Sequence, residues 1–591
     1  MSFDAILVLA VVGVMLLLLI FELYAPDVIV FSALGVLFLS GLLTPQEAFL
    51  GFSNSGMLTV AILFIVAYAA QSSGILELFA NRIMGRCRRV ETGLLRMMMP
   101  VMGMSAFLNN TPIVAMFIPT IRDWAIKNRM SPSKFLIPLS YASIFGGVCT
   151  LIGTSTNLVV NGMLIQEGHQ SLGMFELAYV GIPCALAGSL FLLFVGQRML
   201  PEQADFAEGY QKSGREYLLE MKVDVGSALV GRTIKEAGLR KLDQLFLAEI
   251  LRDGEIFAPV KPEDRLAVGD HLFFAGRADG VIQLQKLSGL TPCHELEFCT
   301  NIQQAGQGRI IEAVVSRSSP MLGKTIKEGN FRARYDAAVL AVNRHGEQVL
   351  FKLGQFVLKP GDTLLLLAGD DFFKKWNQSR DFYMISKVSD VPVVNRKKSW
   401  ISLFVLLGMV LLASSGVMEI LNAAILAVMA LLLTRCVTVV EARRSIEMNV
   451  LIVIASAFGI SKALDNSGAA GFLAGWIIEV VRDMGPIGLL AAIYLATSVL
   501  TEVITNNAAA ALVFPIAMAA AHQLGADPRP FAIAIAIAAS ASFATPIGYQ
   551  TNLMVYGPGG YRFRDFLKVG IPLNLLFMAV SLIVIPLVWK F

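Results

Sequence analysis

Two stretches decide the fold: FLNNTPIVAMFIP, residues 107–119, and VITNNAAAALVFP, residues 503–515. Each is an apolar run interrupted by two adjacent asparagines. Asn110 and Pro119 are nine residues apart, as are Asn506 and Pro515. An apolar segment of this kind enters a bilayer, where an unsatisfied polar group is costly, so an amide pair there needs partners. The repeated pattern predicts an internal duplication with a polar centre.

Other matching segments occur in the same order around both stretches. They are Glu47-Ala48 with Glu441-Ala442, Ser73-Gly74 with Ser467-Gly468, GTSTNL (153–158) with GYQTNL (548–553), and VGIP (180–183) with VGIP (569–572). Agreement in order over such a length predicts two related membrane halves, residues 1–204 and 399–591.

The composition is that of a membrane protein. Hydrophobic residues make up 55% of the chain and charged residues 16%, with a mean hydropathy of +0.66, whereas soluble domains are about 25% charged. The net charge of +4 is small, so no nucleic-acid partner is expected. The six Cys and five His are dispersed, which argues against a disulfide framework or a zinc site. The lipid bilayer is the expected environment.

Apolar runs that could lie in the membrane occur in both halves of the chain. One of them, 400–434, is broken near Ser414-Ser415-Gly416. The runs cover 5–24, 28–43, 56–80, 93–121, 134–163, 172–198, 400–434, 448–465, 486–521, 530–556 and 565–589.

Basic residues predict the topology. They flank the first asparagine pair on both sides: Arg82, Arg86, Arg88, Arg89 and Arg96 before it, and Arg122, Lys127, Arg129 and Lys134 after it. By the positive-inside rule both flanks are cytoplasmic, so the segment between them is a re-entrant hairpin. Its counterpart has few basic flanking residues, and we expect the second half to insert upside down. The chain is then a multi-pass cell-membrane protein of bacterial inner-membrane type, with its insert in the cytoplasm.

The insert, residues 205–398, contains a duplication of its own. Gly231-Arg-Thr-Ile-Lys-Glu236 recurs as Gly323-Lys-Thr-Ile-Lys-Glu328, and Gly269-Asp270 recurs as Gly361-Asp362. Several landmarks at one offset indicate tandem units. We expect two small α/β domains, residues 205–297 and 298–398.

Broken membrane helices supply a chemistry that needs no charged side chain. Their N-termini offer free N–H groups and a positive dipole end to an anion, and their C-termini offer carbonyl oxygens to a cation. The candidate segments are the asparagine pairs and the Gly153–Asn157 and Gly548–Asn552 breaks. A single Asn more often only packs helices, but the duplication favours function. Glu502 is either a cation or proton group or an acid at an interfacial hairpin mouth.

At these residues the chain resembles the divalent anion/sodium symporter family. That family has a Ser-Asn-Thr motif at each hairpin tip, where this chain has Asn109-Asn110-Thr111 and Thr505-Asn506-Asn507, and its Thr-Pro-Pro-Asn breaks lack both prolines here. The resemblance implies two or more Na⁺ ions, an elevator-type mechanism and a homodimer. The implied Na⁺ ligands are Ser105, Asn109, Asn110, Gly153 and Asn157 for one site, and Thr501, Thr505, Asn506, Gly548 and Asn552 for the other. The implied anion-binding residues are Asn109, Asn110, Thr111, Thr154, Ser155, Thr505, Asn506, Asn507 and Thr551.

The insert resembles a pair of TrkA-C domains, which bind regulatory ligands; here it either binds an unknown ligand or only spaces the subunits. Chains with this insert and these breaks look most like the sulfate-transporting branch of the family. We therefore expect Na⁺-coupled symport of sulfate, with a C4 dicarboxylate as the alternative cargo. A TrkA-C-gated cation transporter and a membrane sensor are the alternatives of another class. No catalytic constellation stands out in the sequence, so an enzyme is not expected.

Overall fold

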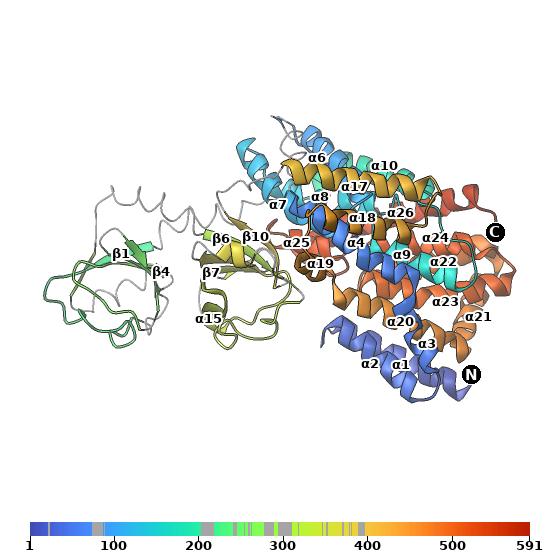
Figure 1. The fold of residues 1–591 in the computed structure, drawn as a ribbon, viewed down its shortest axis with the longest axis horizontal. Helices are drawn as coiled ribbons and strands as arrows, with labels where there is room; N and C mark the ends of the chain where they lie inside the picture. Colours follow the sequence, from blue (N-terminus) through green and yellow to red (C-terminus); the bar gives the residue numbers. More distant parts are fainter. Residues whose placement is uncertain are drawn as a thin grey trace. The chain divides into compact units, whose positions relative to one another are not determined.

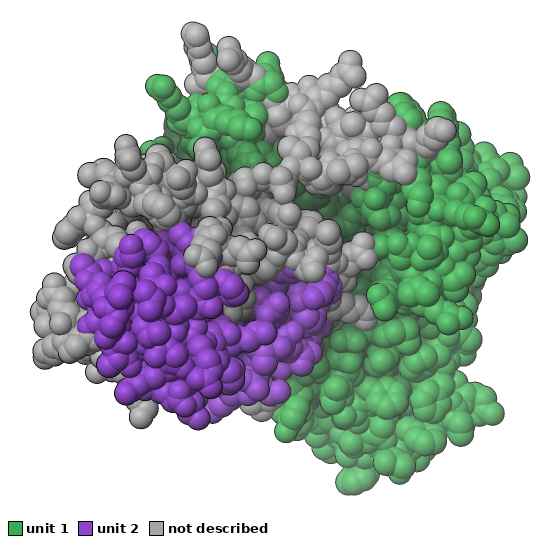
Figure 2. Space-filling model, turned by 60° about the vertical axis from the view of Figure 1, so that its left-hand side comes forward, with its two compact units in different colours: residues 1–202, 392–555, 563–591 green, residues 203–391, 556–562 purple. Residues whose placement is uncertain are grey.

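The computed structural model divides the chain into two compact units (Figure 2). The helical unit comprises residues 1–202, 392–555 and 563–591, and the insert unit comprises 203–391 and 556–562. The structure describes residues 1–21, 24–73, 85, 87, 89–202 and 396–591, and within the insert 218–239, 245–252, 255–257, 260–261, 263–276, 289–292, 310–316, 318–344, 347–349, 353–368, 372–376, 379 and 381–387. Gly74, Arg82, Arg86, Arg88 and the expected boundaries at 204 and 297 lie outside these residues.

The helical unit is a multi-span bundle. Among the described residues, seven helical segments are long and apolar enough to cross a membrane. Asn506–Leu524 is 72% buried inside the protein and Phe563–Val588 only 22%, so the helix that follows the second asparagine pair is enclosed by others (Figure 1). The helices are α1 (Phe3–Ile20), α2 (Pro26–Leu39), α3 (Pro45–Phe49), α4 (Ser55–Ser72), α6 (Val90–Ser105), α7 (Asn110–Lys127), α8 (Leu136–Gly147), α9 (Ser155–Gln166), α10 (Ala178–Phe191), α11 (Gln197–Met199), α17 (Arg396–Ser414), α18 (Ile420–Leu433), α19 (Val439–Ser445), α20 (Met448–Asn466), α21 (Ala469–Val480), α22 (Gly485–Thr501), α23 (Asn506–Leu524), α24 (Pro528–Ser540), α25 (Gln550–Tyr556) and α26 (Phe563–Val588).

Both asparagine pairs lie where one helix ends and another begins. α6 ends at Ser105 and α7 begins at Asn110; α22 ends at Thr501 and α23 begins at Asn506. The expected interruption within residues 400–434 is also present, because α17 ends at Ser414 and α18 begins at Ile420. α17 begins at Arg396, so the expected domain boundary at 398 falls in its first turn.

The two polar breaks lie earlier in the chain than the sequence indicates. The non-helical residues are 148–154 and 541–549, and Asn157 and Asn552 already belong to α9 and α25. The expected breaks at 153–157 and 548–552 were therefore wrong at their C-terminal ends. An Asn in a first helical turn can reach back to carbonyls left free by the preceding helix.

Capping explains one of the matched landmarks. Glu47 in α3 and Glu441 in α19 each occupy the third position of a capping box, in which Thr44 and Thr438 are the partners. Such a box satisfies two free backbone N–H groups of a helix start. Glu47-Ala48 and Glu441-Ala442 therefore recur because each starts a short helix.

The insert contains two five-stranded antiparallel sheets (Figure 1). Their orders are β3-β2-β4-β1-β5 and β10-β6-β9-β7-β8, which are the same order when the strands of each sheet are numbered separately and one list is reversed. In the second sheet α15 (Phe331–Tyr335) precedes β7, and α16 (Phe372–Trp376) precedes β10. The strands are β1 (Leu218–Val223), β2 (Leu245–Arg252), β3 (Glu255–Phe257), β4 (His271–Gly276), β5 (Leu290–Pro292), β6 (Ile310–Val315), β7 (Ala337–Arg344), β8 (Glu347–Val349), β9 (Thr363–Ala368) and β10 (Phe382–Lys387).

A repeated ion pair explains the Gly-Asp landmark of the insert. Asp270 is fully buried and receives two hydrogen bonds from Arg252, at 2.7 and 2.8 Å. Asp362 receives two from Arg344, at 2.7 and 2.6 Å. Gly269 and Gly361 precede these acids, and each has a φ of 83°, which L side chains rarely adopt. Each copy of the Gly-Asp landmark thus stabilises its own sheet.

Candidate functional site

Four segments make up the candidate site. We call residues 109–111 the first tip, 505–507 the second tip, 148–154 the first break and 541–549 the second break. α9, which follows the first break, packs against α4, α23 and α24. The side chains of Asn110, Asn157, Thr501, Thr551 and Asn552 have no exposed surface, so these polar groups depend on the protein for partners.

Each half has the same set of internal hydrogen bonds. The hydroxyl that ends the helix before a tip donates to the tip Asn. A Thr of the break donates to the carbonyl of the residue after this hydroxyl and accepts from a glycine N–H. An Asn of the following helix donates to two carbonyls, which lie in the break or directly before it. The matched contacts are Ser105 Oγ to Asn110 Oδ1 with Thr501 Oγ1 to Asn506 Oδ1; Thr150 Oγ1 to Ala106 O with Thr545 Oγ1 to Glu502 O; Gly153 N to Thr150 Oγ1 with Gly548 N to Thr545 Oγ1; and Asn157 Nδ2 to Gly147 O and Thr150 O with Asn552 Nδ2 to Ser542 O and Thr545 O.

The tips also bond to the opposite half. Thr111 Oγ1 of the first tip donates to Gln550 Oε1 at 3.0 Å. Asn507 Oδ1 of the second tip accepts from Ser155 Oγ at 3.3 Å and from Thr156 Oγ1 at 3.0 Å. Thr111 and Asn507 occupy equivalent positions in the two halves, and so do Gln550 and Ser155. The contact from the first tip to the second half therefore has an equivalent from the second tip to the first half. A reciprocal pair of contacts is what a two-fold relation produces.

Oxygen atoms converge beside the first tip. A Cβ built on Gly147 would lie 3.0 Å from Asn110 Oδ1 and 3.4 Å from Gly153 O, so only glycine leaves this space open. The Asn157 side-chain oxygen is buried and has no hydrogen-bond partner among the described residues. Neutral oxygens gathered in a buried space, one of them unpartnered, suit a hard cation.

A second group of oxygens surrounds Gly548. A Cβ there would lie 2.2 Å from Ser542 Oγ, 2.9 Å from Thr501 O and 3.0 Å from Thr545 Oγ1. In this half Asn552 Oδ1 accepts a hydrogen bond from Ser140 Oγ at 2.7 Å, and the Thr551 hydroxyl lies 2.8 Å from the same oxygen. The two oxygen groups therefore differ at this position, because the described residues give Asn157 no equivalent of the Ser140 contact.

Sequence reasoning missed Thr150 and Thr545, the hydroxyls that tie each break to its hairpin. A signal was present: Thr150-Leu-Ile-Gly153 and Thr545-Pro-Ile-Gly548 share Thr-x-Ile-Gly directly before the breaks that were recognised. Gly147 and Ser542 occupy equivalent positions but were missed, because the two residues are of different types and belong to no recognised motif.

Three helix starts at the site have no side-chain cap. Asn109 before α7, Thr154 before α9 and Thr505 before α23 make no capping hydrogen bond to the helix that follows. A pocket beside the starts of α7 and α9 is lined by Asn109, Thr154 and Ser155, together with apolar residues that include several of α4. Thr505 Oγ1 is also buried without a partner among the described residues. Their free N–H groups can therefore bind an anion.

Glu502 has a role that the sequence did not reveal. Its carboxylate accepts hydrogen bonds from the N–H groups of Phe543, Ala544 and Thr545, at 2.8 to 2.9 Å, and from the Asn574 amide at 2.7 Å. The acid therefore satisfies the backbone of the second break, which neither earlier interpretation had anticipated.

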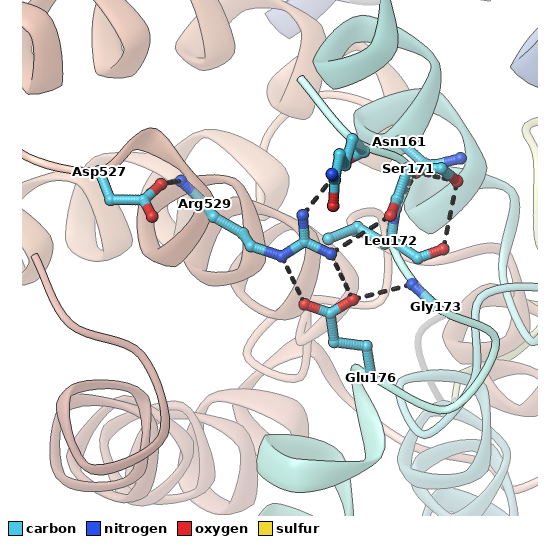
Figure 3. Close-up of polar contacts among 8 residues, drawn as sticks. Asn161, Ser171, Leu172, Gly173, Glu176, Asp527 and Arg529 are labelled. Atoms are coloured by element: carbon cyan, nitrogen blue, oxygen red, sulfur yellow. Dashed lines mark hydrogen bonds and ion pairs between the residues drawn. The ribbon is translucent and has the colours of Figure 1, made fainter.

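An ion pair joins the halves near the start of α24 (Figure 3). Arg529 binds Glu176 through two hydrogen bonds of 2.6 Å and also donates to the Gln170 and Ser171 carbonyls at 3.2 Å. Burial raises the pKa of Glu176, but the Arg529 contacts and the Gly173 N–H outweigh it and lower the pKa below its usual range. Bidentate pairing of this kind fixes geometry as well as charge.

A multi-span bundle in which broken helices meet is the architecture of membrane transporters. Residues 16–538 and 509–590 match the citrate transporter family, CitMHS, and the chain belongs to this family. It is therefore a transporter rather than an enzyme.

Relatives extend along most of the chain. A Chlamydomonas reinhardtii protein whose name assigns it to the sulfur deprivation response is 38% identical over 95% of this chain and 97% of its own. An uncharacterized transporter of Synechocystis is 31% identical over 99% of this chain and 97% of its own. Sodium/sulfate cotransporter 1 of C. reinhardtii is 27% identical over 91% of this chain and 84% of its own. The expected kinship with sodium/sulfate symporters is confirmed.

One solved structure, the GsuK channel, matches 28% of this chain and 53% of its own at 14% identity and a TM-score of 0.15. A superposition this poor supports no inference, so the resemblance of the insert to TrkA-C domains stays a prediction.

Proposed function

We propose that this protein carries a small divalent anion, with sulfate as the cargo, across a membrane in symport with sodium. The observation that carries the proposal is the reciprocal contact between each tip and the opposite break, Thr111 with Gln550 and Asn507 with Ser155. These contacts gather two oxygen groups and three uncapped helix starts in one buried place. Cation and anion sites formed together are what coupling requires.

The sodium ions bind to neutral oxygens in this proposal. The first site takes Asn110, Gly153 and the unpartnered Asn157 oxygen, together with Ser105 and Asn109. The second takes Thr501, Gly548 and Asn552, together with Thr505 and Asn506. Ser542 and Thr545 join the second site, because their oxygens face Gly548.

The anion binds between the tips. The tips and breaks contain no Lys or Arg, so its charge is met by backbone N–H groups, amides and hydroxyls, together with the bound sodium ions. The proposed anion-binding residues are those of both tips together with Thr154, Ser155 and Thr551. Sulfate is favoured over a C4 dicarboxylate because relatives named sodium/sulfate cotransporters align along most of the chain.

The remaining expectations belong to the same proposal. The two halves are inverted repeats with re-entrant hairpins, a homodimer supports an elevator-type movement, and the insert lies in the cytoplasm. The matched hydrogen bonds of the two halves support the repeat.

The test is uptake of radiolabelled sulfate into proteoliposomes under an inward Na⁺ gradient, with K⁺ as the control. We expect Na⁺-dependent uptake that excess unlabelled sulfate inhibits and succinate does not. Uptake of succinate in place of sulfate would replace the cargo and keep the mechanism. Uptake of neither anion would overturn the proposed symport.

A second candidate function is a membrane sensor of sulfate. It is favoured by the relative that is 38% identical and is named for the sulfur deprivation response. A sensor would bind sulfate without transporting it. Na⁺-dependent protection of the purified protein against thermal unfolding by sulfate, combined with no uptake, would support this alternative.

A further inference from the structure

A tyrosine of the second break reaches into the first half of the site. Tyr549 is 7% exposed, and its hydroxyl lies 2.6 Å from Asn110 Nδ2 of the first tip. The same hydroxyl lies 3.5 Å from Thr154 Oγ1, at the N-cap of α9. One phenol thus stands between a tip and a break, where the cargo is proposed to bind.

This contact has no counterpart on the other side. The residue that matches Tyr549 is Thr154, since Gly153-Thr154 aligns with Gly548-Tyr549. Its reciprocal partner would be Asn506, but no Thr154–Asn506 hydrogen bond occurs in the described helical unit. Threonine is too short to span the gap that a phenol bridges. The two-fold pattern therefore fails at this position.

The two tip asparagines consequently offer different groups to a ligand. Asn110 is fully buried, and both ends of its amide are bonded within the protein, to Ser105 and to Tyr549. Asn506 is half-buried; its oxygen accepts from Thr501, and its nitrogen has no partner among the described residues. The free donor for an anion is therefore on the second tip.

The Tyr549 hydroxyl adds one donor on the opposite side. It accepts the Asn110 amide proton, and its other neighbour, Thr154 Oγ1, lies at the long end of hydrogen-bond range, where either hydroxyl can be the donor. The Tyr549 proton can therefore turn toward a ligand. An anion oxygen close by is a better acceptor. The ring that carries this hydroxyl is far larger than the threonine side chain at the matching position of the other half.

We infer that Tyr549 is a specificity-determining residue, whose ring limits the site to a compact anion and whose hydroxyl donates to it. This inference rests on the proposed symport. Sulfate and a C4 dicarboxylate dianion carry the same charge, and both only accept hydrogen bonds. A binding site therefore discriminates poorly between them by hydrogen bonding alone. Size separates them, and Tyr549 is an aromatic side chain that bonds directly to a tip.

Two substitutions of Tyr549 test the contributions of its ring and its hydroxyl separately. Tyr549→Thr installs the residue of the matching position, and we expect the ratio of sulfate to succinate uptake to fall on the order of tenfold or more. Tyr549→Phe keeps the ring, and we expect an unchanged ratio with a KM for sulfate about tenfold higher. Tyr494→Phe, which makes the same change at a buried tyrosine of α22, should leave both quantities unchanged.

The assay is Na⁺-driven uptake of both anions into proteoliposomes, normalised to monodisperse protein. If wild type takes up sulfate and Tyr549→Thr keeps wild-type selectivity, the inference fails and the symport stands. If wild type takes up no sulfate, both fail. Should Tyr549→Thr not fold, Tyr549→Leu carries the same size test, and a wild-type KM in Tyr549→Phe would remove the hydroxyl from the argument.

Discussion

The insert and the helical unit each contain a set of polar contacts that occurs twice, but the two sets use opposite chemistry. In the insert the repeated contact is a charged pair, Arg252 with Asp270 and Arg344 with Asp362. In the helical unit the repeated contacts join hydroxyls, amides and backbone groups, as in Ser105 with Asn110 and Thr501 with Asn506.

The environment accounts for the difference. The Arg side chains of the insert are 32% and 22% exposed, so water shares their solvation. A membrane bundle makes an unpaired charge expensive, and neutral donors satisfy the broken helices there. The repeated contacts of the insert stabilise a sheet, whereas those of the helical unit leave oxygens and N–H groups free for ligands. A duplicated motif therefore indicates function only where it leaves groups unpaired.

The largest expected effect is on the stability of the insert. Asp362→Ala leaves Arg344 without its partner, and we expect a local loss of about 3 kcal/mol or more. Hydrogen exchange in β6 to β10 of the full chain should accelerate, while sulfate uptake per folded molecule changes little. Glu328→Gln, at an exposed cap, is the control. Loss of uptake without faster exchange would contradict the structural role of this pair.

The largest expected effect on transport comes from the tips. Asn110→Ala removes an oxygen from the first proposed sodium site and the hydrogen-bond partner of Tyr549, and we expect uptake to fall roughly 100-fold. Asn506→Ala should do the same from the other half. Na⁺-driven uptake of protein that is monodisperse in detergent measures this, with the exposed Asn466→Ala as the control. Wild-type uptake in either tip variant would refute the assignment of that tip.

Glu502 is the charged side chain in the hydrogen bonds that connect the second tip with the second break. Its counterpart in the first half is Ala106, so Glu502→Ala makes the halves alike. Three backbone N–H groups of the second break then lose their acceptor, and we expect about 2 kcal/mol of destabilisation. Thermal unfolding in detergent measures this, against Glu479→Gln on the surface of α21. An unchanged midpoint would mean that the break holds its shape without the acid.

The smallest effect concerns the Arg529–Glu176 pair. A double-mutant cycle with Glu176→Gln and Arg529→Gln should give a coupling of about 1–2 kcal/mol, since both side chains are less than a quarter exposed. Because the pKa of Glu176 is lowered from its usual 4.5, this contribution is present above that value and is lost as pH falls through the lower, folded-state pKa. A coupling that persists in acid would contradict the ionic pairing.

The sequence by itself determined the two asparagine pairs, the approximate positions of the breaks, the interruption near Ser414 and the tandem sheets. These follow from local signals, because apolar periodicity, caps and glycines with positive φ act over a few residues of chain. Even Glu47-Ala48, recognised only as a match, is such a signal, since it closes a capping box.

Only the tertiary structure decided which segments meet across the halves. Thr111 with Gln550, Asn507 with Ser155, and Tyr549 with Asn110 are separated by hundreds of residues, and no local pattern encodes their pairing. The function of Glu502 was hidden for the same reason, because an acid beside a tip looks identical in sequence whether it faces a ligand or binds the backbone of a break about 40 residues away. Packing selects among partners that the sequence leaves equivalent, since a buried polar group must find whichever donor or acceptor the fold brings to it.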